Sequence, residues 1–396
     1  VGLPDRYESE GFDRENLFMP PSHVELVRRI RAVNPNVAVV LAGGSVIDMS
    51  WEADAKAILM MYLGGQAVGG AVADLVTGAA CPGGKLAESW PLRLEDNPSF
   101  AYFPGYPRTV EYRESIFVGY RYYDTAGKTV RYPFGYGLSY TSFRYDNLRL
   151  SEKTLDVGET VGISCDVTNT GETAGAETVQ LYVSHRSDVL FTAEQELKGF
   201  EKVFLQPGET KTVSFVLNRR DLCYYDVVAQ DWRVEGGRYE LRVCASSRDI
   251  RLNAFITAEP GVNLSLPDHH ADAPCYYDLS SGIDVSDEAF AALLGRPIPP
   301  RERQPGEPHT LNATLEETQD TLLGRMLVSV GRRIASRMAG TDEIAGDIAE
   351  HSVFTSPLRM MSMEGGGVPP RIVEGLVIMI NGRFFGGLKH MLTRLS

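Results

Sequence analysis

Two carboxylates in one polar loop near the start of the chain have the residue type and spacing for proton transfer. Glu8 and Glu10 lie two positions apart within residues 7–14, a segment that also contains Asp13 and Arg14. A loop glutamate can act as a general acid or base when partial burial or a neighbouring charge raises its pKa toward the working pH. Most loop glutamates are simply solvated, and composition alone favours that interpretation for both residues.

Two further groups of residues could bind a ligand. Four glycines lie close together, at Gly64, Gly65, Gly69 and Gly70. Neither a G-x-G-x-x-G pattern nor a Walker lysine accompanies them, so close helix packing is favoured over phosphate binding. Residues 268–272 contain two aspartates and two adjacent histidines, but adjacent histidines point apart and no partner spacing follows. We expect a solvated loop there, and no metal or organic cofactor.

The composition is that of an ordinary globular protein with an acidic surface. The 396 residues carry a net charge of −13, which repels phosphate backbones and predicts no nucleic-acid partner. The 5 scattered cysteines show no C-x-x-C spacing, which argues against a disulfide framework or a zinc site and favours a reducing cytoplasm, here a bacterial one. The longest apolar run is far shorter than the roughly 20 residues that span a bilayer, so no membrane span is expected.

Residues 1–105 have the alternation of an α/β layer. Residues 37–42 are a continuous apolar run, typical of a parallel strand that is buried on both faces. We expect a helix capped by Ser22 before this strand, and helices over residues 55–62 and 65–77 after it. This segment predicts only half of an α/β sandwich domain, and the polar opening at Val1 indicates that the chain starts inside a domain.

We expect residues 106–144 to form a linker and hinge. From residue 145 onward, apolar residues recur at every second position. Apolar and polar residues alternate in four stretches, at 161–167, 179–183, 213–217 and 239–243. Turn signals rich in Gly, Pro and Asn separate them. Half-buried strands at such spacing predict an all-β sandwich over residues 145–258.

Residues 259–396 form a linker and a helical C-terminal extension. Thr314 and Glu317 have the spacing of a capping box, and apolar residues at helical spacing follow it. We expect a last, apolar helix over residues 372–395 that also carries arginine and lysine. A membrane-surface role is one interpretation of this helix. Packing against another domain, or against a partner subunit in a homo-oligomer, is the other.

Three stretches together resemble the β-glucosidases of glycoside hydrolase family 3. Residues 7–14, Y-E-S-E-G-F-D-R, are similar to that family's E-x-E-G-Y-D-R loop. Residues 64–86 follow its spacing of G-Q, G-G, A-D and P-x-G-K-L. Residues 120–140 are similar to its Y-R-Y-Y-D and P-F-G-Y-G-L-S-Y hinge into a fibronectin type III-like domain. The resemblance covers residues 1–258, in the family's order.

The resemblance implies a multidomain α/β plus all-β fold. A partial α/β sandwich, a parallel sheet with helices, precedes the fibronectin type III-like β-sandwich and the helical tail. It gives Glu10 the role of general acid/base. Asp13 and Arg14 are expected to order the loop as an ion pair or hydrogen-bond clamp, which is favoured over direct contact with a sugar. It places the nucleophilic aspartate on an N-terminal barrel, which we expect outside this chain. The Asp231–Trp232 pair matches a structural turn of the family instead.

The implied reaction is hydrolysis, with retention, of terminal non-reducing β-D-glucosyl residues in a β-glucoside or oligosaccharide. This chain alone is expected to be inactive, because one of the two carboxyl groups is not in it. The alternative is a non-catalytic carbohydrate-binding or structural module. A pure binding module has no need of the S-E-G-F-D-R sequence, which favours the enzyme. Substrate-binding residues and the choice between glucosides and xylosides stay open.

Overall fold

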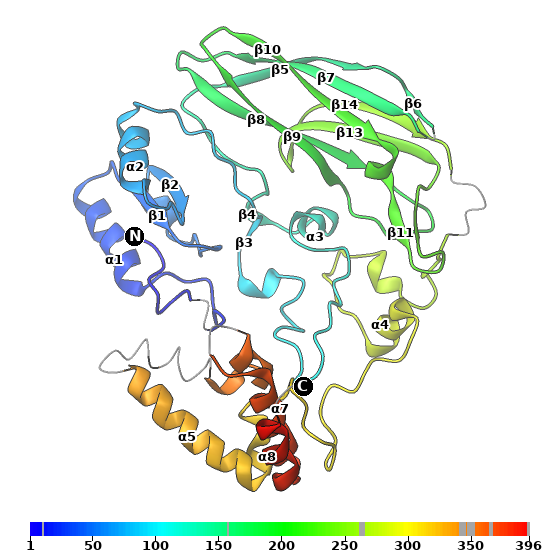
Figure 1. Cartoon of the computed structure of the whole chain (residues 1–396). Helices are drawn as coiled ribbons and strands as arrows, with labels where there is room; N and C mark the ends of the chain where they lie inside the picture. The colour runs from blue at the N-terminus through cyan, green and yellow to red at the C-terminus, as the bar shows by residue number, and fades with distance from the viewer. Residues whose placement is uncertain are drawn as a thin grey trace. The chain divides into compact units, whose positions relative to one another are not determined.

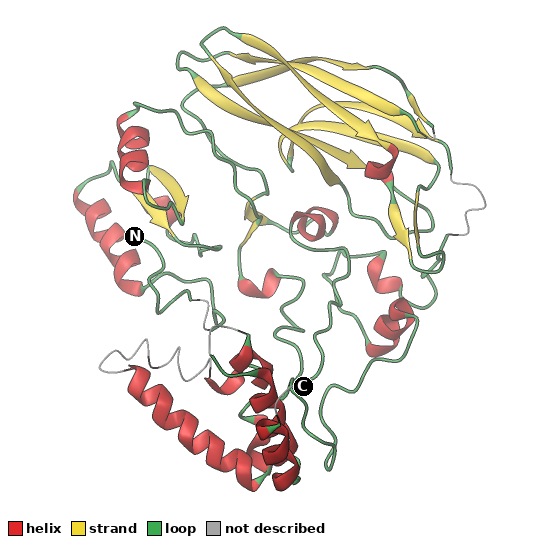
Figure 2. Cartoon of the chain, viewed as in Figure 1, coloured by secondary structure: helices red, strands yellow, loops and turns green. Residues whose placement is uncertain are grey.

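A computed structural model describes residues 1–9, 12–156, 158–260, 266–339, 346, 353–363 and 367–393 (Figures 1 and 2). The chain forms two compact units: residues 24–301 make the larger one, and residues 1–23 together with 302–396 make the smaller one. None of the helices in the described residues combines the length and apolar character that a bilayer-spanning helix needs. The architecture is α/β plus all-β, with a helical C-terminal end (Figure 2).

The larger unit contains a small parallel sheet near its start. β1 (Ala38–Ala42) pairs in parallel with β2 (Ala57–Tyr62), after α1 (Pro21–Val33) and before α2 (Val68–Thr77). Leu41 in β1 is fully buried, whereas β2 and α2 contain no buried residue. Parallel sheets are normally covered on both faces. The apolar residues of β2 and α2 are half-buried or exposed, so the described residues cover this layer only in part.

Two expectations for this layer are wrong. Residues 57–62 form β2 rather than a helix, because their backbone pairs in register with β1, with Ile58 opposite Val39. Tertiary pairing here overrides the helix preference of Ala, Leu and Met. Ser22 is not a cap either, since α1 begins one residue earlier, at Pro21. Proline is well suited to a first helical turn, where its missing N–H would have no partner in the helix.

The β-sandwich is confirmed, with two sheets made of eight strands among the described residues (Figure 1). One sheet has the order β10-β7-β5, and the other has the order β6-β14-β13-β8-β9. All neighbours are antiparallel except the short β6. The strands are β5 (Phe143–Leu150), β6 (Thr154–Leu155), β7 (Thr160–Asn169), β8 (Gly175–Ser184), β9 (Glu196–Leu205), β10 (Thr210–Asn218), β13 (Gly237–Ser246) and β14 (Asp249–Ala258).

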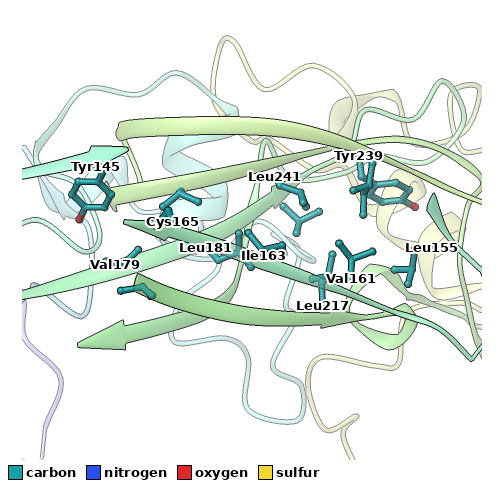
Figure 3. Packing of buried hydrophobic residues seen from close by; sticks show 14 of the residues in the cluster. Tyr145, Leu155, Val161, Ile163, Cys165, Val179, Leu181, Leu217, Tyr239 and Leu241 are labelled. Atoms are coloured by element: carbon teal, nitrogen blue, oxygen red, sulfur yellow. The ribbon is translucent and has the colours of Figure 1, made fainter. Parts of the chain in front are cut away.

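The core of the sandwich lies between these sheets (Figure 3). Alternate residues of β7, among them Val161, Ile163 and Cys165, point inward and are buried. They meet inward residues of the other sheet, such as Leu181 and Leu241. Each fully buried side chain of this size contributes about 1.5–3 kcal/mol of transfer free energy. The period-2 pattern in the sequence thus identified the face that packs.

The remaining elements of the larger unit gather around aromatic side chains. They are β3 (Trp90–Pro91), β4 (Val130–Tyr132), α3 (Tyr120–Thr125), β11 (Tyr224–Asp226), β12 (Asp231–Arg233) and α4 (Asp287–Leu294). Tyr122 and Tyr123 of α3 form a buried cluster with Tyr276 and Phe290. Residues 266–301 are therefore held against the hinge region by an apolar core of their own.

An ion network reinforces this attachment. Arg113 is buried and donates to Glu111 at 2.7 Å (Nη2 to Oε2) and also to Asp287 at the start of α4. Arg301 donates to Glu111 at 2.7 Å (Nε to Oε1) and to Asp287 at 3.0 Å (Nη1 to Oδ2). Hydrogen bonds from Arg301, and next from Arg113, lower the pKa of Asp287 to about 2. Arg301 likewise holds the pKa of Glu111 below its ordinary value.

Replacing Arg301 with methionine is expected to lower the free energy of unfolding of the larger unit by about 1.5–3 kcal/mol, the range for hydrogen bonds to charged groups. Glu111 keeps Arg113 but loses its second cation. Urea unfolding at pH 7 measures the change. Arg144→Met is the matched control, because Arg144 pairs with Asp146 at the surface. Exposed pairs of this kind contribute roughly 0–1 kcal/mol.

The stabilisation from Arg301 is also expected to depend on pH. Glu111 and Asp287 have lowered pKa values in the folded chain. Their contribution is therefore fully present above their ordinary pKa of about 4 and is lost as the pH falls toward 2. The gap between Arg301→Met and the parent should shrink over that range. A gap that does not change with pH would instead indicate lost packing of Arg301 on the Tyr106 ring, 4.6 Å from its guanidinium.

The smaller unit contains α5 (Leu322–Ala339), α7 (Pro370–Ile380) and α8 (Phe384–Leu392). The predicted capping box is present: Thr314 N donates to Glu317 Oε2 at 2.7 Å, and Glu317 N donates to Thr314 Oγ1 at 3.2 Å. It precedes a short 3-10 helix (Glu317–Asp320), and α5 starts just after it. Val328 of α5 packs with Val373 and Val377 of α7 in a small apolar core.

The single helix expected over residues 372–395 is wrong, because α7 and α8 are separate helices. Gly382 between them has a φ of +82°, a conformation that glycine adopts without strain. The Asn381 side chain accepts from His309 N at 2.7 Å and donates to His309 O at 2.9 Å. These two hydrogen bonds fix the turn against the backbone of His309, which lies 72 positions earlier in the sequence.

Candidate active site

The loop of residues 7–14 has a defined backbone on both sides of Glu10. Glu10 itself and Gly11 lie outside the described residues. Ser9 and Phe12, the described residues on either side of them, form an antiparallel bridge. On the N-terminal side, the amides of Tyr7 and Glu8 donate to Pro4 O at 2.7 Å and 3.2 Å. The flanking residues are therefore held by backbone hydrogen bonds.

The other polar residues of this loop differ in exposure. Glu8 and Arg14 are half-buried, and Asp13 is exposed. Phe12, where the family commonly has tyrosine, is half-buried too. The loop-ordering role of Asp13 and Arg14 stays a prediction. The partial burial of Glu8 keeps it as the nearest carboxylate alternative to Glu10.

His23 is a residue of this segment that sequence reasoning missed. Its Nδ1 lies 3.3 Å from Gly2 N and 3.0 Å from Gly2 O, which holds the first residues against the start of α1. Met19 just before the helix is buried. No local pattern marks His23, because its partner is a backbone group that is 21 positions away in the sequence.

The four glycines of residues 64–70 do not share one role. A Cβ added to Gly64 would clash with the Val68 side chain, so close packing is confirmed there. A Cβ added to Gly69 or Gly70 would meet no described atom within 4 Å. The predicted close helix packing at these two positions therefore has no partner among the described residues. Both belong to the uncovered surface of α2.

The segment P-G-G-K-L is a structural joint between the α/β layer and the β-sandwich. Leu86 N donates to Tyr136 O, and Gly135 N donates to Leu86 O, both at 2.8 Å. A Cβ on Gly137 would collide with the backbone of Gly84, and one on Gly83 would press on Ala176. The glycines allow the two backbones to approach closely.

Lys85 crosses this joint and enters a buried polar cluster that sequence reasoning also missed. Its Nζ lies 3.1 Å from Glu177 Oε1 in β8 and donates to Gly137 O at 3.2 Å. Tyr145 OH donates to the same carboxylate oxygen at 3.0 Å. The side chains of Lys85 and Glu177 are 14% and 6% exposed. Burial, and then the charge of Glu177, raise the pKa of Tyr145.

Four aromatic rings of the hinge stack on one another in pairs, whereas Tyr140 at its end is 52% exposed. Tyr120 stacks on Phe134 with ring centroids 4.8 Å apart, and Tyr132 stacks on Tyr136 at 5.2 Å. Trp232, beside Asp231 in β12, has the Arg220 guanidinium 3.2 Å from its ring centroid. These contacts agree with the expected structural roles of the hinge and of the Asp-Trp pair.

The two histidines of residues 268–272 pair with different carboxylates. His269 Nδ1 lies 3.0 Å from Asp272 Oδ1, and His270 Nδ1 lies 2.7 Å from Asp268 Oδ1. His270 also stacks on Tyr277. Across the described ranges, no group of three or more His, Cys, Asp or Glu side chains could hold a metal ion. This run is a loop that is held by local histidine–aspartate hydrogen bonds.

Comparison with known families gives two matches on this chain. Residues 1–140 match the glycosyl hydrolase family 3 C-terminal domain, and residues 177–247 match the fibronectin type III-like domain. The first range contains the loop around Glu10, the glycine segment and the hinge. The second contains β8, β9, β10 and β13 of the sandwich. The smaller unit's residues 302–396 lie beyond both ranges.

Several curated proteins are similar over most of the chain. Thermostable beta-glucosidase B of Acetivibrio thermocellus is 44% identical over 297 residues, which are 74% of this chain and 38% of that protein. An exo-alpha-(1->6)-L-arabinopyranosidase of Bifidobacterium breve is 45% identical over 260 residues, 65% of this chain and 34% of that protein. The chain thus spans little more than a third of the length of these relatives.

Solved structures show the same partial correspondence. A glycoside hydrolase family 3 β-glucosidase of Bifidobacterium adolescentis superposes with a TM-score of 0.64 at 40% identity, over 74% of this chain and 42% of that one. A β-glucosidase of Kluyveromyces marxianus in complex with glucose gives 0.62 at 42% identity, over 65% of this chain and 31% of that one. Both likenesses cover a larger share of this chain than of the solved one.

Proposed function

Residues 1–140 of this chain are a C-terminal domain of glycosyl hydrolase family 3, followed by a fibronectin type III-like domain, and on this premise we propose that the chain is the C-terminal portion of a retaining β-glucosidase. Its substrate class is a β-glucoside or oligosaccharide with a terminal non-reducing β-D-glucosyl residue. Glu10 is the general acid/base. The nucleophilic aspartate belongs to an N-terminal barrel that is not part of residues 1–396.

The chemistry divides between two carboxyl groups. In a retaining glycosidase they lie about 5–5.5 Å apart across the scissile bond. The nucleophile attacks the anomeric carbon while Glu10 donates its proton to the departing glycosidic oxygen. In the second step Glu10 takes a proton from water as the water oxygen displaces the nucleophile. No metal or organic cofactor enters either step.

The observation that carries this proposal is the domain match over residues 1–140, which contains the loop. The loop geometry supports it. The Ser9–Phe12 bridge pairs the described residues that flank Glu10 and Gly11 in the sequence. Loops anchored on a stable scaffold often carry catalytic groups.

The uncovered α/β layer supports the need for a further polypeptide segment. The described sheet here has two strands, and α2 buries none of its residues. Seven large side chains within residues 100–118 are also exposed, at Phe100, Phe103, Tyr106, Val110, Tyr112, Ile116 and Val118. Apolar surface of this extent indicates a contact with another segment or chain. We assign it to the barrel-bearing portion of the enzyme.

The chain alone is expected to show no turnover of an aryl β-D-glucoside, whereas a form extended upstream of Val1 by its barrel is active. The reason is that the glycosyl-enzyme intermediate requires the absent nucleophile. Spectrophotometric release of the aryl alcohol measures both. Hydrolysis by residues 1–396 alone would contradict the assignment of the nucleophile. Inactivity of the extended form would favour the alternative, a non-catalytic carbohydrate-binding or structural module.

The same assay distinguishes among sugars. The relatives include proteins named for β-glucosidase and for exo-α-(1→6)-L-arabinopyranosidase activity at nearly equal identity, 44% and 45%. Aryl β-D-glucoside, β-D-xyloside and α-L-arabinopyranoside should therefore be compared at equal concentration. We expect the largest kcat/KM for the glucoside. A higher value for either pentoside would keep the acid/base assignment and change the substrate.

A further inference from the structure

Glu114 in the larger unit is a buried carboxylate that neither step of the proposed reaction uses. It is 6% exposed, and its Oε2 has no hydrogen-bond partner among the described residues. Burying a charge costs free energy unless a cation or hydrogen-bond donors offset it, so buried carboxylates are normally paired. Glu114 therefore needs a partner for this oxygen that the described residues do not supply.

The polar groups beside Glu114 are engaged with other partners. Arg113, its neighbour in the sequence, donates to Glu111 and Asp287. Tyr276 is close in space: burial raises its pKa above the ordinary value, and the charge of Glu114 adds to this effect. The Tyr276 hydroxyl nevertheless donates to Arg113 O at 2.7 Å. Neither the guanidinium nor the hydroxyl therefore pairs with Glu114.

The backbone holds Glu114 in its buried position. Ser115, the next residue, has a φ of +54°, a conformation that side chains other than glycine rarely adopt. Phe117 N donates to Glu114 O at 3.0 Å, and the Phe117 side chain is fully buried. A backbone of this kind persists where the surrounding contacts impose it. The carboxylate is therefore kept away from solvent by the fold itself.

Exposed apolar side chains flank this carboxylate in the sequence. Val110, Tyr112, Ile116 and Val118 are 63%, 72%, 36% and 49% exposed, and together with Glu114 they are here called the Glu114 surface. The centre of a protein interface commonly combines aromatic and aliphatic contacts with a few desolvated charge pairs. The Glu114 surface contains the apolar contacts and one half of such a pair.

We propose that the Glu114 surface binds a segment of the barrel-bearing portion that presents an arginine or lysine side chain to Glu114. This inference rests on the proposed function, which places that portion upstream of Val1. The chain spans 38% of the Acetivibrio thermocellus relative, so a partner of this size is available in such enzymes. The buried pair fixes the register in which the two portions meet.

A second copy of the same surface does not fit Glu114. Residues 110–118 contain one cation, Arg113, which is buried and already paired. A twofold contact would therefore bring a second carboxylate to the first, and no available cation. Like charges at close range oppose such an interface.

The test compares Glu114→Gln in residues 1–396 alone and in the barrel-containing enzyme, the form that is extended upstream of Val1. In the chain alone the substitution removes a buried charge that lacks a partner, so the thermal midpoint should rise by about 2–4 °C. In the enzyme it leaves the cation of the other portion unpaired, so the midpoint should fall by at least about 2–4 °C. Differential scanning fluorimetry at pH 7 measures both.

Hydrogen exchange locates the contact. Amides of residues 110–118 should exchange about tenfold or more slowly in the enzyme than in the chain alone, because the other portion covers them there. Glu114→Gln should abolish most of that difference. Circular dichroism shows whether the variant is folded in both forms.

Glu177→Gln is the matched control. Glu177 is also a buried carboxylate, but its cation, Lys85, belongs to this chain. Its replacement should therefore lower the midpoint in both forms, without the change of sign that is expected for Glu114→Gln.

Three results would overturn the inference. The first is a midpoint shift of the same sign in both forms for Glu114→Gln. The second is equal exchange of residues 110–118 in the two forms. The third is a raised KM for an aryl glucoside with midpoint and exchange unchanged, which would make Glu114 a substrate contact. An inactive enzyme that still shows the change of sign would contradict the proposed glycosidase activity and leave this inference intact.

Discussion

Replacing Glu10 with glutamine is expected to lower aryl β-glucoside hydrolysis by the barrel-containing enzyme by about two to four orders of magnitude, the usual contribution of a general acid/base. Glutamine has nearly the shape of glutamate but can neither donate the proton to the leaving oxygen nor take one from water. Sodium azide should restore activity, because this anionic nucleophile needs no general base. The product is then the β-glucosyl azide, with retained configuration.

The dependence on the leaving group gives a second, independent measurement. A good leaving group, such as a dinitrophenolate, departs without protonation. The glycosylation step of Glu10→Gln should therefore be nearly normal with such an aryl glucoside and slow with an alkyl glucoside. In the parent enzyme the two substrates should differ much less. A residue that only orders the loop would affect both substrates equally.

Glu8→Gln is the matched control, because Glu8 is in the same loop and carries the same functional group. It should retain activity within about tenfold, without azide rescue. If Glu10→Gln has undiminished activity, the loop is structural, and Glu8 becomes the first carboxylate to examine. Azide rescue of Glu8→Gln, with none for Glu10→Gln, would transfer the acid/base role to Glu8.

Replacing Lys85 with methionine is expected to lower the free energy of unfolding by about 3–5 kcal/mol, the cost of leaving one buried charge without its partner. Glu177 is 6% exposed and would keep only the Tyr145 hydroxyl from the present cluster. Urea unfolding measures the change. Hydrogen exchange should show faster exchange in residues 81–86 and 133–137, where the two segments meet.

Two variants separate charge from packing. Adding Glu177→Gln to Lys85→Met removes the unpaired charge and should restore part of the lost stability, which a double-mutant cycle quantifies. Lys211→Met is the exposed control, since Lys211 pairs with Glu209 at 3.4 Å with 46% and 35% exposure. It should cost roughly 0–1 kcal/mol. Equal losses for Lys85→Met and Lys211→Met would show that the buried pair has no special contribution.

Local sequence patterns correctly predicted the features that depend only on residues close together in the sequence. The alternation of Val161, Ile163 and Cys165 follows from the strand period, and the same residues line the sandwich core. The reciprocal hydrogen bonds of Thr314 and Glu317 need only a spacing of three residues. Such features depend on neighbours in the sequence, so they can be read there.

Predictions failed where distant partners decide the outcome. Residues 57–62 have a helical composition, but pairing with β1 makes them a strand. The helix expected over residues 372–395 divides at Asn381, whose side chain binds the His309 backbone 72 positions away. In both cases the deciding hydrogen bonds are formed by residues that no local window contains.

Buried polar partners were the other group that local patterns did not identify. Glu177 lies two residues before Val179 in β8. Because side chains alternate along a strand, the sequence already places Glu177 on the same inward face as Val179. Its partner Lys85 was not visible there, because the pair joins segments that are 92 positions apart in the sequence. A buried carboxylate predicts that a cationic side chain lies beside it, but the sequence pattern does not show which residue supplies that side chain.

The sequence by itself determined the order of the domains, the chemistry available to the loop and the acidic character of the chain, because residue type and short spacing carry that information. Only the tertiary structure decided which surfaces remain without cover. The apolar residues of α2 and α8 resemble core residues in composition. Whether an apolar residue is buried depends on what packs against it, and that is a property of the folded chain.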